Sequence, residues 1–144
     1  VGSAPAVDAA VLSRDVMPLE AEDHVELGRR RARELAQRRG FDAFAQAAVT
    51  TATSELARNA LVHGGGGTAV IEVVERNGRA GVRVECRDNG PGILDLERAL
   101  RGGFSVTGTL GLGLSGARRL VDEFHVESAP GQGTVVAFVK WARA

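Results

Sequence analysis

What the sequence lacks narrows the class of protein. The 144 residues include one cysteine, Cys86, so no disulfide can form within the chain. No apolar run approaches the roughly 20 residues that a helix needs to cross a bilayer. Residues 1–10 lack the basic start and the apolar stretch of a secretory signal. We therefore expect a cytoplasmic protein without a membrane span.

The sequence also lacks an excess of charge of either sign. It has 18 basic and 18 acidic residues, and Lys140 is the only lysine. This balance argues against nucleic acid or an anionic membrane as the main partner. The basic cluster of residues 29–33 lies between Glu26 and Glu34, so a solvated helix face is its simplest interpretation.

The length suits one domain. A chain of 144 residues buries roughly 68–70% of its unfolded surface, which is enough for a hydrophobic core without disulfide bonds. We expect a flexible leader over residues 1–8 and a single domain over residues 9–144.

Apolar spacing and turn residues predict the helices and strands. The predicted elements are strand 11–17, helix 20–39, helix 42–63, strand 68–76, strand 79–87, helix 95–101, helix 114–122, strand 124–128 and strand 134–141. Pro18 is expected to close the first strand, Asp42 to cap the second helix, and Asn77-Gly78 to form a type I′ hairpin turn. The order predicts an α+β two-layer sandwich, in which helices cover one face of a mixed, mostly antiparallel sheet.

Residues 102–113 form a glycine-rich segment. It contains glycines at 102, 103, 108, 111 and 113, with Ser105, Thr107 and Thr109 among them. Such a segment has too few apolar side chains to fix its own position. We expect it to be a mobile lid.

The predicted second helix carries a pair of polar side chains. Glu55 and Asn59 are four residues apart, so an acid and an amide project from the same helical face. Such a pair can hold a metal ion and activate a hydroxyl group. Most polar pairs at this spacing are simply solvated, so the pair gains weight only from motifs elsewhere in the chain.

Three later motifs favour nucleotide binding. Asp88, followed by Gly90 and Gly92, suits recognition of a flat ring with an N–H donor, although the same residues also make a common turn. Residues 111–116 fit G-x-G-x-x-G at a helix start, where a phosphate is favoured, but no parallel βαβ unit precedes them and a dinucleotide fold is excluded. Thr134 could place a hydroxyl group near the same ring, although threonine is also ordinary at a strand start.

Four motifs follow one another in a fixed order. They are Glu55-x-x-x-Asn59, Asp88-x-Gly90-x-Gly92, Gly111-Leu112-Gly113-Leu114 and Gly131-x-Gly133-Thr134. This order resembles the GHKL ATPase and kinase superfamily, which has the Bergerat fold, and the resemblance covers nearly the whole chain. Segments such as residues 54–59 and 118–124 look most like the RsbT-type switch serine/threonine kinases. The related RsbW-type anti-sigma factor kinases share fewer of these segments.

The resemblance implies roles for individual residues. Asn59 would bind Mg²⁺ bridging the triphosphate of ATP, Asp88 would read the adenine amino group, and Glu55 would be the catalytic general base. The other residues implied to contact ATP are Arg58, Gly90, Gly92, Gly108, Gly111, Leu112, Gly113, Leu114 and Thr134. An ordinary surface arginine would explain Arg58 equally well.

The resemblance also implies an activity and partners. It implies transfer of phosphate from ATP to serine or threonine of a STAS-domain protein, as in the stressosome partner switch of bacterial stress signalling. A metal-dependent serine/threonine phosphatase would be a second partner, which the kinase binds and activates. The alternative is a nucleotide-dependent binding module of the anti-sigma factor type that sequesters a sigma factor.

Overall fold

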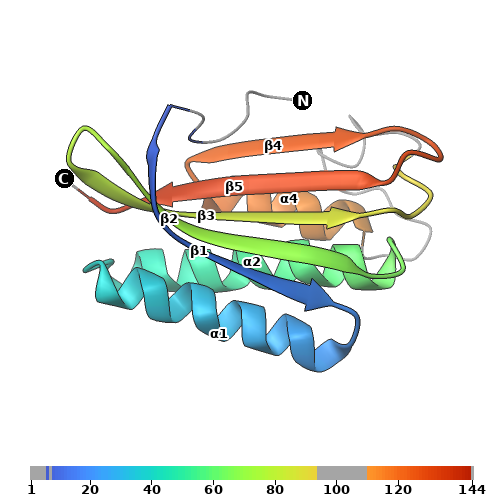
Figure 1. Ribbon diagram of the computed structural model, residues 1–144, viewed down its shortest axis with the longest axis horizontal. Helices are drawn as coiled ribbons and strands as arrows, with labels where there is room; N and C mark the ends of the chain where they lie inside the picture. Colours follow the sequence, from blue (N-terminus) through green and yellow to red (C-terminus); the bar gives the residue numbers. More distant parts are fainter. Residues whose placement is uncertain (1–5, 7, 94–109, 144) are drawn as a thin grey trace.

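The computed structural model describes residue 6, residues 8–93 and residues 110–143, with the backbone alone for residues 110–112. The elements are β1 (Ala10–Leu19), α1 (Glu22–Arg38), α2 (Ala43–Val62), β2 (Gly67–Arg76), β3 (Arg79–Asp88), α4 (Leu110–Leu120), β4 (Glu123–Ser128) and β5 (Thr134–Trp141). They form two layers, with the helices on one face of a five-stranded sheet (Figure 1). No helix in the described part is long and apolar enough to span a membrane.

The sheet has the strand order β1-β2-β3-β5-β4. All four pairings are antiparallel. The predicted two-layer α+β fold is confirmed, but the expectation of a mixed sheet is wrong in this detail. Strand β4 runs parallel to β3, yet the β4–β5 hairpin places β5 between them, so no parallel neighbours arise.

Strand β1 lies at one edge of the sheet, as predicted. It continues through Pro18 to Leu19, so the prediction that Pro18 closes the strand is wrong. An edge strand forms hydrogen bonds on one side only and therefore tolerates a residue without an N–H group. The extra length carries the Leu19 side chain into the core, where it is fully buried.

Two connections follow the sequence predictions closely. Asn77 and Gly78 have φ values of 55° and 75°, as a type I′ hairpin turn requires. At the start of α2, Asp42 Oδ1 accepts a hydrogen bond from the Ala45 N–H group at 2.8 Å. Gly40, between α1 and α2, has a φ of +76°, the left-handed conformation in which helices commonly end.

The core lies between the sheet and the helices. Val82, Val84 and Cys86 alternate along β3 on its helix-facing side, and all three are buried in the same cluster as Phe138 of β5. The α2 residues in this cluster are Ala45, Val49, Ala52, Leu56, Ala57 and Ala60. Because most of them are small, α2 can approach the sheet closely, and this helix carries Glu55 and Asn59.

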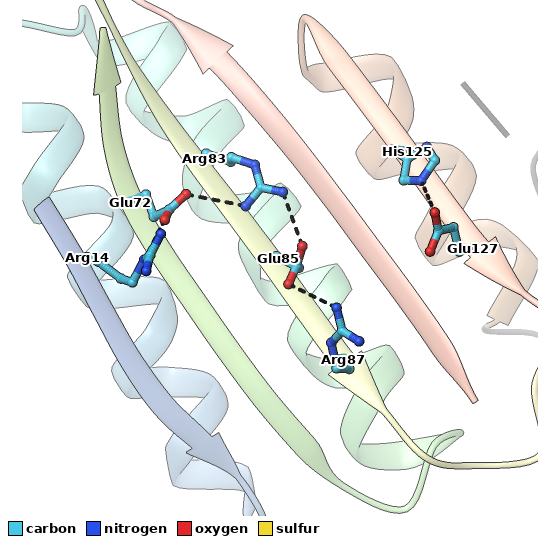
Figure 2. A network of polar contacts seen from close by, with 7 residues as sticks. All are labelled: Arg14, Glu72, Arg83, Glu85, Arg87, His125 and Glu127. Carbon is cyan, nitrogen blue, oxygen red and sulfur yellow. Dashed lines mark hydrogen bonds and ion pairs between the residues drawn. The ribbon is translucent and has the colours of Figure 1, made fainter. Parts of the chain in front are cut away.

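The opposite face of the sheet carries a row of ion pairs (Figure 2). Glu72 of β2 is only 4% exposed and accepts hydrogen bonds from Arg14 at 2.7 Å and Arg83 at 3.3 Å. Arg83 also pairs with Glu85 at 3.1 Å. Arg14 and Arg83 lie directly opposite Glu72 on the two neighbouring strands, so these contacts favour the observed register of β1, β2 and β3.

Two residues of the expected leader contact the sheet. The Ala6 N–H group donates to Glu123 at 3.0 Å, and Asp8 pairs with Arg76 at 2.8 Å. Glu123 also pairs with Arg76 at 2.7 Å and accepts from the Trp141 indole at 2.6 Å. These contacts connect the chain before β1 to β2, β4 and β5.

We expect Asp42→Ala to lower the free energy of unfolding by about 1 kcal/mol, because the Ala45 N–H group loses its acceptor at the start of α2. Chemical denaturation of the purified variant measures the loss. Asp42→Asn keeps an acceptor oxygen and serves as the control. Equal losses in the two variants would contradict the capping role.

Candidate functional site

Three segments that are distant in the sequence meet at one end of the sheet. They are the end of α2, the end of β3 with the turn after it, and the start of β5. A small cavity between them is lined by Asn59, His63, Gly64, Asp88, Gly92, Ile93 and Thr134. Its volume is about 20 Å³, close to the space of one water molecule. The structure therefore brings together the predicted residues Asn59, Asp88, Gly92 and Thr134.

Asp88 is the most constrained side chain of the cavity. It is 5% exposed, and its Oδ1 accepts a hydrogen bond from the Gly90 N–H group at 2.9 Å. Burial raises the pKa of this carboxyl group above its ordinary value, while hydrogen bonds from the backbone N–H groups of Gly90 and Thr134 oppose the rise. The result is a desolvated acceptor in a fixed position, which suits a ligand that brings an N–H donor.

Asn59 presents an acceptor that nothing in the described structure uses. Its side chain is 7% exposed, and Oδ1 is buried without a hydrogen-bond partner among the described residues. A buried polar atom left in this state costs about 1–3 kcal/mol. Mg²⁺ binds hard oxygen donors, which include amide carbonyl oxygens besides carboxylate, phosphate and water oxygens, so Asn59 fits the predicted metal contact.

Glu55 lies one helical turn before Asn59 and is half-buried against α4. A Cβ atom added to Gly113 would be 2.8 Å from Glu55 Oε2, so the glycine leaves room for the carboxylate. Helix α4 begins at Leu110, four residues before the predicted start. Residues 110–113 of the expected lid are therefore helical, and their part in a mobile lid stays a prediction. Glycine lowers helix propensity by about 1 kcal/mol per residue, but the packing of α4 on α2 outweighs this cost.

Parts of the predicted lid and the predicted helix over 95–101 fall outside the residues that the structure describes. Gly108, residues 102–109 of the expected lid and the expected helix over 95–101 lie outside the described residues. Gly111 and Leu112 are described by their backbone, which is helical.

Two predicted contacts lie away from the cavity lining. Arg58 is exposed, and its Nε is 3.7 Å from Glu22 of α1. Leu114 is fully buried in the hydrophobic core beneath α4. Their assignment to ATP stays a prediction, since the structure places Arg58 on the surface and Leu114 in the core.

The glycines around Asp88 allow backbone segments to approach one another. A Cβ atom added to Gly90 would be 2.6 Å from the Gly64 Cα, and one added to Gly92 would be 2.1 Å from a backbone oxygen of the β4–β5 turn. A Cβ atom on Gly133 would be 2.3 Å from the Asp88 backbone oxygen. The function of these glycines in the structure is thus to let three loops converge on one carboxylate.

Sequence reasoning missed Ser128, the last residue of β4. Its hydroxyl oxygen accepts a hydrogen bond from the Ile93 N–H group at 2.8 Å. The hydroxyl group donates to the Gly133 carbonyl at 3.2 Å, and its oxygen lies 2.8 Å from Thr134 Oγ1. Ser128 and Thr134 are direct partners across the β4–β5 hairpin. The signal was available, because the predicted strands 124–128 and 134–141 place these two residues opposite each other.

Comparison with known proteins identifies the family of this chain. The family model of histidine kinase-, DNA gyrase B-, and HSP90-like ATPases matches residues 45–143. The chain belongs to this ATPase family. The matched segment contains every residue that lines the cavity, whereas β1, α1 and the Asp42 cap precede it.

Two relatives of known name are similar to this chain over most of its length. Over 118 residues the chain is 45% identical to the serine/threonine-protein kinase RsbT of Bacillus subtilis, which covers 82% of this chain and 86% of that protein. It is 31% identical over 97 residues to the anti-sigma F factor of Thermoanaerobacter sp. (strain X514), covering 65% of this chain and 68% of the factor.

A solved structure supports the fold. The crystal structure of the RsbU and RsbW domains of a Mycobacterium tuberculosis protein matches 92% of this chain with a TM-score of 0.62 and 21% sequence identity. This chain spans 33% of that longer chain. At this identity the match supports the Bergerat fold of the ATPase family and carries no argument about activity.

Gly131 and Gly133 offer a matched test of the close packing at Asp88, because both have a φ of +76° in the same turn. We expect Gly131→Ala to lower the free energy of unfolding by about 1–2 kcal/mol through backbone strain alone. Gly133→Ala should lower the free energy of unfolding by about 1–3 kcal/mol more than Gly131→Ala does, since its Cβ atom would also collide with the Asp88 backbone oxygen. Urea denaturation of both variants measures the difference, and equal losses would contradict the packing argument.

Proposed function

We propose that this chain is an ATP-dependent protein serine/threonine kinase that phosphorylates a STAS-domain regulatory protein in a bacterial stress-signalling partner switch. The kinase class follows from the 45% identity to RsbT over most of the chain. The observation that carries the proposed site is the small cavity in which the buried Asp88 carboxylate and the unpartnered Asn59 oxygen lie together. The STAS substrate rests on the resemblance to RsbT-type kinases.

In this proposal the adenine ring of ATP binds over the cavity. Its amino group would donate to Asp88, whose carboxylate is desolvated and positioned by the Gly90 and Thr134 N–H groups. A cavity of about 20 Å³ does not hold the whole ring, so only the amino edge would enter it. Thr134 lines the same cavity, and its hydroxyl group would add a second polar contact.

The phosphate end would lie toward Asn59 and α4. The Asn59 Oδ1 would supply one ligand to Mg²⁺, and phosphate oxygens and water would complete the coordination. The ion supplies charge neutralisation for the phosphates during transfer. The helical start of α4, which includes Gly111 and Gly113, offers backbone N–H groups for the same negative charge.

Glu55 would be the general base. It is on the same helix as Asn59, one turn away, and its carboxylate lies beside Gly113 of α4. The acceptor hydroxyl of the substrate protein would transfer its proton to Glu55 as its oxygen bonds to the γ-phosphorus. The bond from that phosphorus to the bridging oxygen breaks at the same stage, and ADP leaves.

A second candidate function is favoured by one observation, the 31% identity to an anti-sigma F factor. In that case the fold would hold nucleotide and sequester a sigma factor. Stoichiometric capture of a sigma factor, without transfer of label to a STAS-domain protein, would favour this candidate. We also propose that this kinase, once it has left its phosphorylated STAS-domain substrate, binds and activates a metal-dependent phosphatase. A phosphatase assay with the purified kinase would test this.

We expect Glu55→Gln to reduce phosphotransfer at least about 100-fold, the usual contribution of a general base, and to leave ATP affinity nearly unchanged. The measurement is transfer of labelled γ-phosphate from Mg-ATP to a STAS-domain protein encoded near the gene for this chain. Glu26→Gln, an exposed acid on α1, is the control. Transfer at the normal rate by Glu55→Gln would rule out the assigned role.

We expect Asn59→Leu to raise the stability of the nucleotide-free protein by about 1 kcal/mol, because it removes a buried oxygen without a partner. The same variant should lose Mg-dependent ATP binding. Chemical denaturation and titration calorimetry measure the two effects. Gln37→Leu on the exposed side of α1 is the control for the change of side-chain type. A destabilised Asn59→Leu protein that still binds Mg-ATP would contradict both parts.

A further inference from the structure

The hydroxyl group of Ser128 has three close contacts and one proton to share among them. The Ile93 N–H group, at 2.8 Å, can only donate to the hydroxyl oxygen. The Gly133 carbonyl, at 3.2 Å, can only accept from it. The third contact, to Thr134 Oγ1 at 2.8 Å, joins two hydroxyl groups, and either of them is able to donate.

One arrangement satisfies all three contacts. If Ser128 gives its proton to the Gly133 carbonyl, its two lone pairs accept from Ile93 and from Thr134. The proton of Thr134 then points away from any ligand, toward Ser128. The Thr134 oxygen therefore has only lone pairs left for a ligand in the cavity that Thr134 lines.

The second polar group at this edge of the cavity has the same character. The Asp88 carboxylate, when ionised, accepts hydrogen bonds and cannot donate. Two of its acceptor positions are occupied by the N–H groups of Gly90 and Thr134. Asp88 and Thr134 together therefore form an edge that accepts hydrogen bonds and offers no side-chain donor.

We infer that Ser128 is a positioning residue that orients the Thr134 hydroxyl as an acceptor and so makes the site prefer a 6-amino purine to a 6-oxo purine. A 6-amino group donates to both acceptors, whereas a 6-oxo group would face two acceptors, and none of these three oxygens would have a proton to donate to another. This inference rests on the proposed nucleotide site at Asp88. It adds to that site a residue that does not line the cavity.

The test compares the dissociation constants of Mg-ATP and Mg-ITP, which differ in having an amino or an oxo group at position 6. Titration calorimetry of the intact chain measures binding without requiring phosphotransfer. In Ser128→Ala the Thr134 hydroxyl is free to rotate and to donate to an oxo group. We expect the affinity for ITP to rise relative to the affinity for ATP, so that the ratio of the ITP to the ATP dissociation constant falls about tenfold.

Two further variants separate positioning from simple support of the loop. Ser128→Thr keeps the hydroxyl group and should restore the preference for ATP. In a Thr134→Val background the hydroxyl that Ser128 orients is gone, so adding Ser128→Ala should leave the ratio of the two constants unchanged. If Ser128 only supported the loop, Ser128→Ala would lower the affinities for both nucleotides by the same factor. That result would overturn the inference.

The outcomes for the unaltered protein distinguish this inference from the function on which it rests. Failure to bind either nucleotide overturns the proposed function and the inference with it. Tight binding of ATP and ITP with equal affinity overturns the inference and leaves a nucleotide site in place. Strong preference for ATP that persists in Ser128→Ala also overturns it, because the selectivity then does not depend on the orientation of Thr134.

Discussion

The close approach of backbone segments around Asp88 is the constraint on which the site depends. The end of β3, the residues after α2 and the β4–β5 turn come together there, and a side chain at Gly64 or Gly133 would collide with Asp88 itself. A carboxylate is expensive to bury, and the backbone N–H groups of Gly90 and Thr134 offset part of that cost at Asp88. Convergence of the loops thus creates both the cavity and the polarity of its wall.

The buried acids on the two faces of the sheet have different hydrogen-bond partners. Glu72 on the open face is 4% exposed and is paired with two arginines. Asp88 is 5% exposed, and the hydrogen bonds that it receives from the described residues come from the backbone. Within the same part of the structure, Asn59 Oδ1 in the same cavity receives none. The first arrangement holds strands in register. The second leaves acceptors unused, which is a cost to the free protein that a bound nucleotide and its metal ion would remove.

The helices place the proposed chemistry beside the proposed binding site. Helix α2 is rich in alanine where it lies on the sheet, so Asn59 reaches the cavity, while Glu55 on the same helix faces α4. Gly113 permits that second contact because it has no side chain. One helix therefore connects the proposed metal ligand to the proposed base.

The sequence by itself determined the order of the described elements, the type I′ turn and the cap at Asp42, because each depends on spacing or on a local backbone preference. The roles proposed for Glu55, Asn59 and Asp88 come from the resemblance to the ATPase family. Tertiary structure decided what depends on distant partners. It ordered residues 110–113 as helix against α2, continued β1 through Pro18 at the sheet edge, made the sheet wholly antiparallel and placed Ser128 beside Thr134 and Ile93. Local propensity is weak, at about 1 kcal/mol per residue, so packing between segments overrides it wherever they meet.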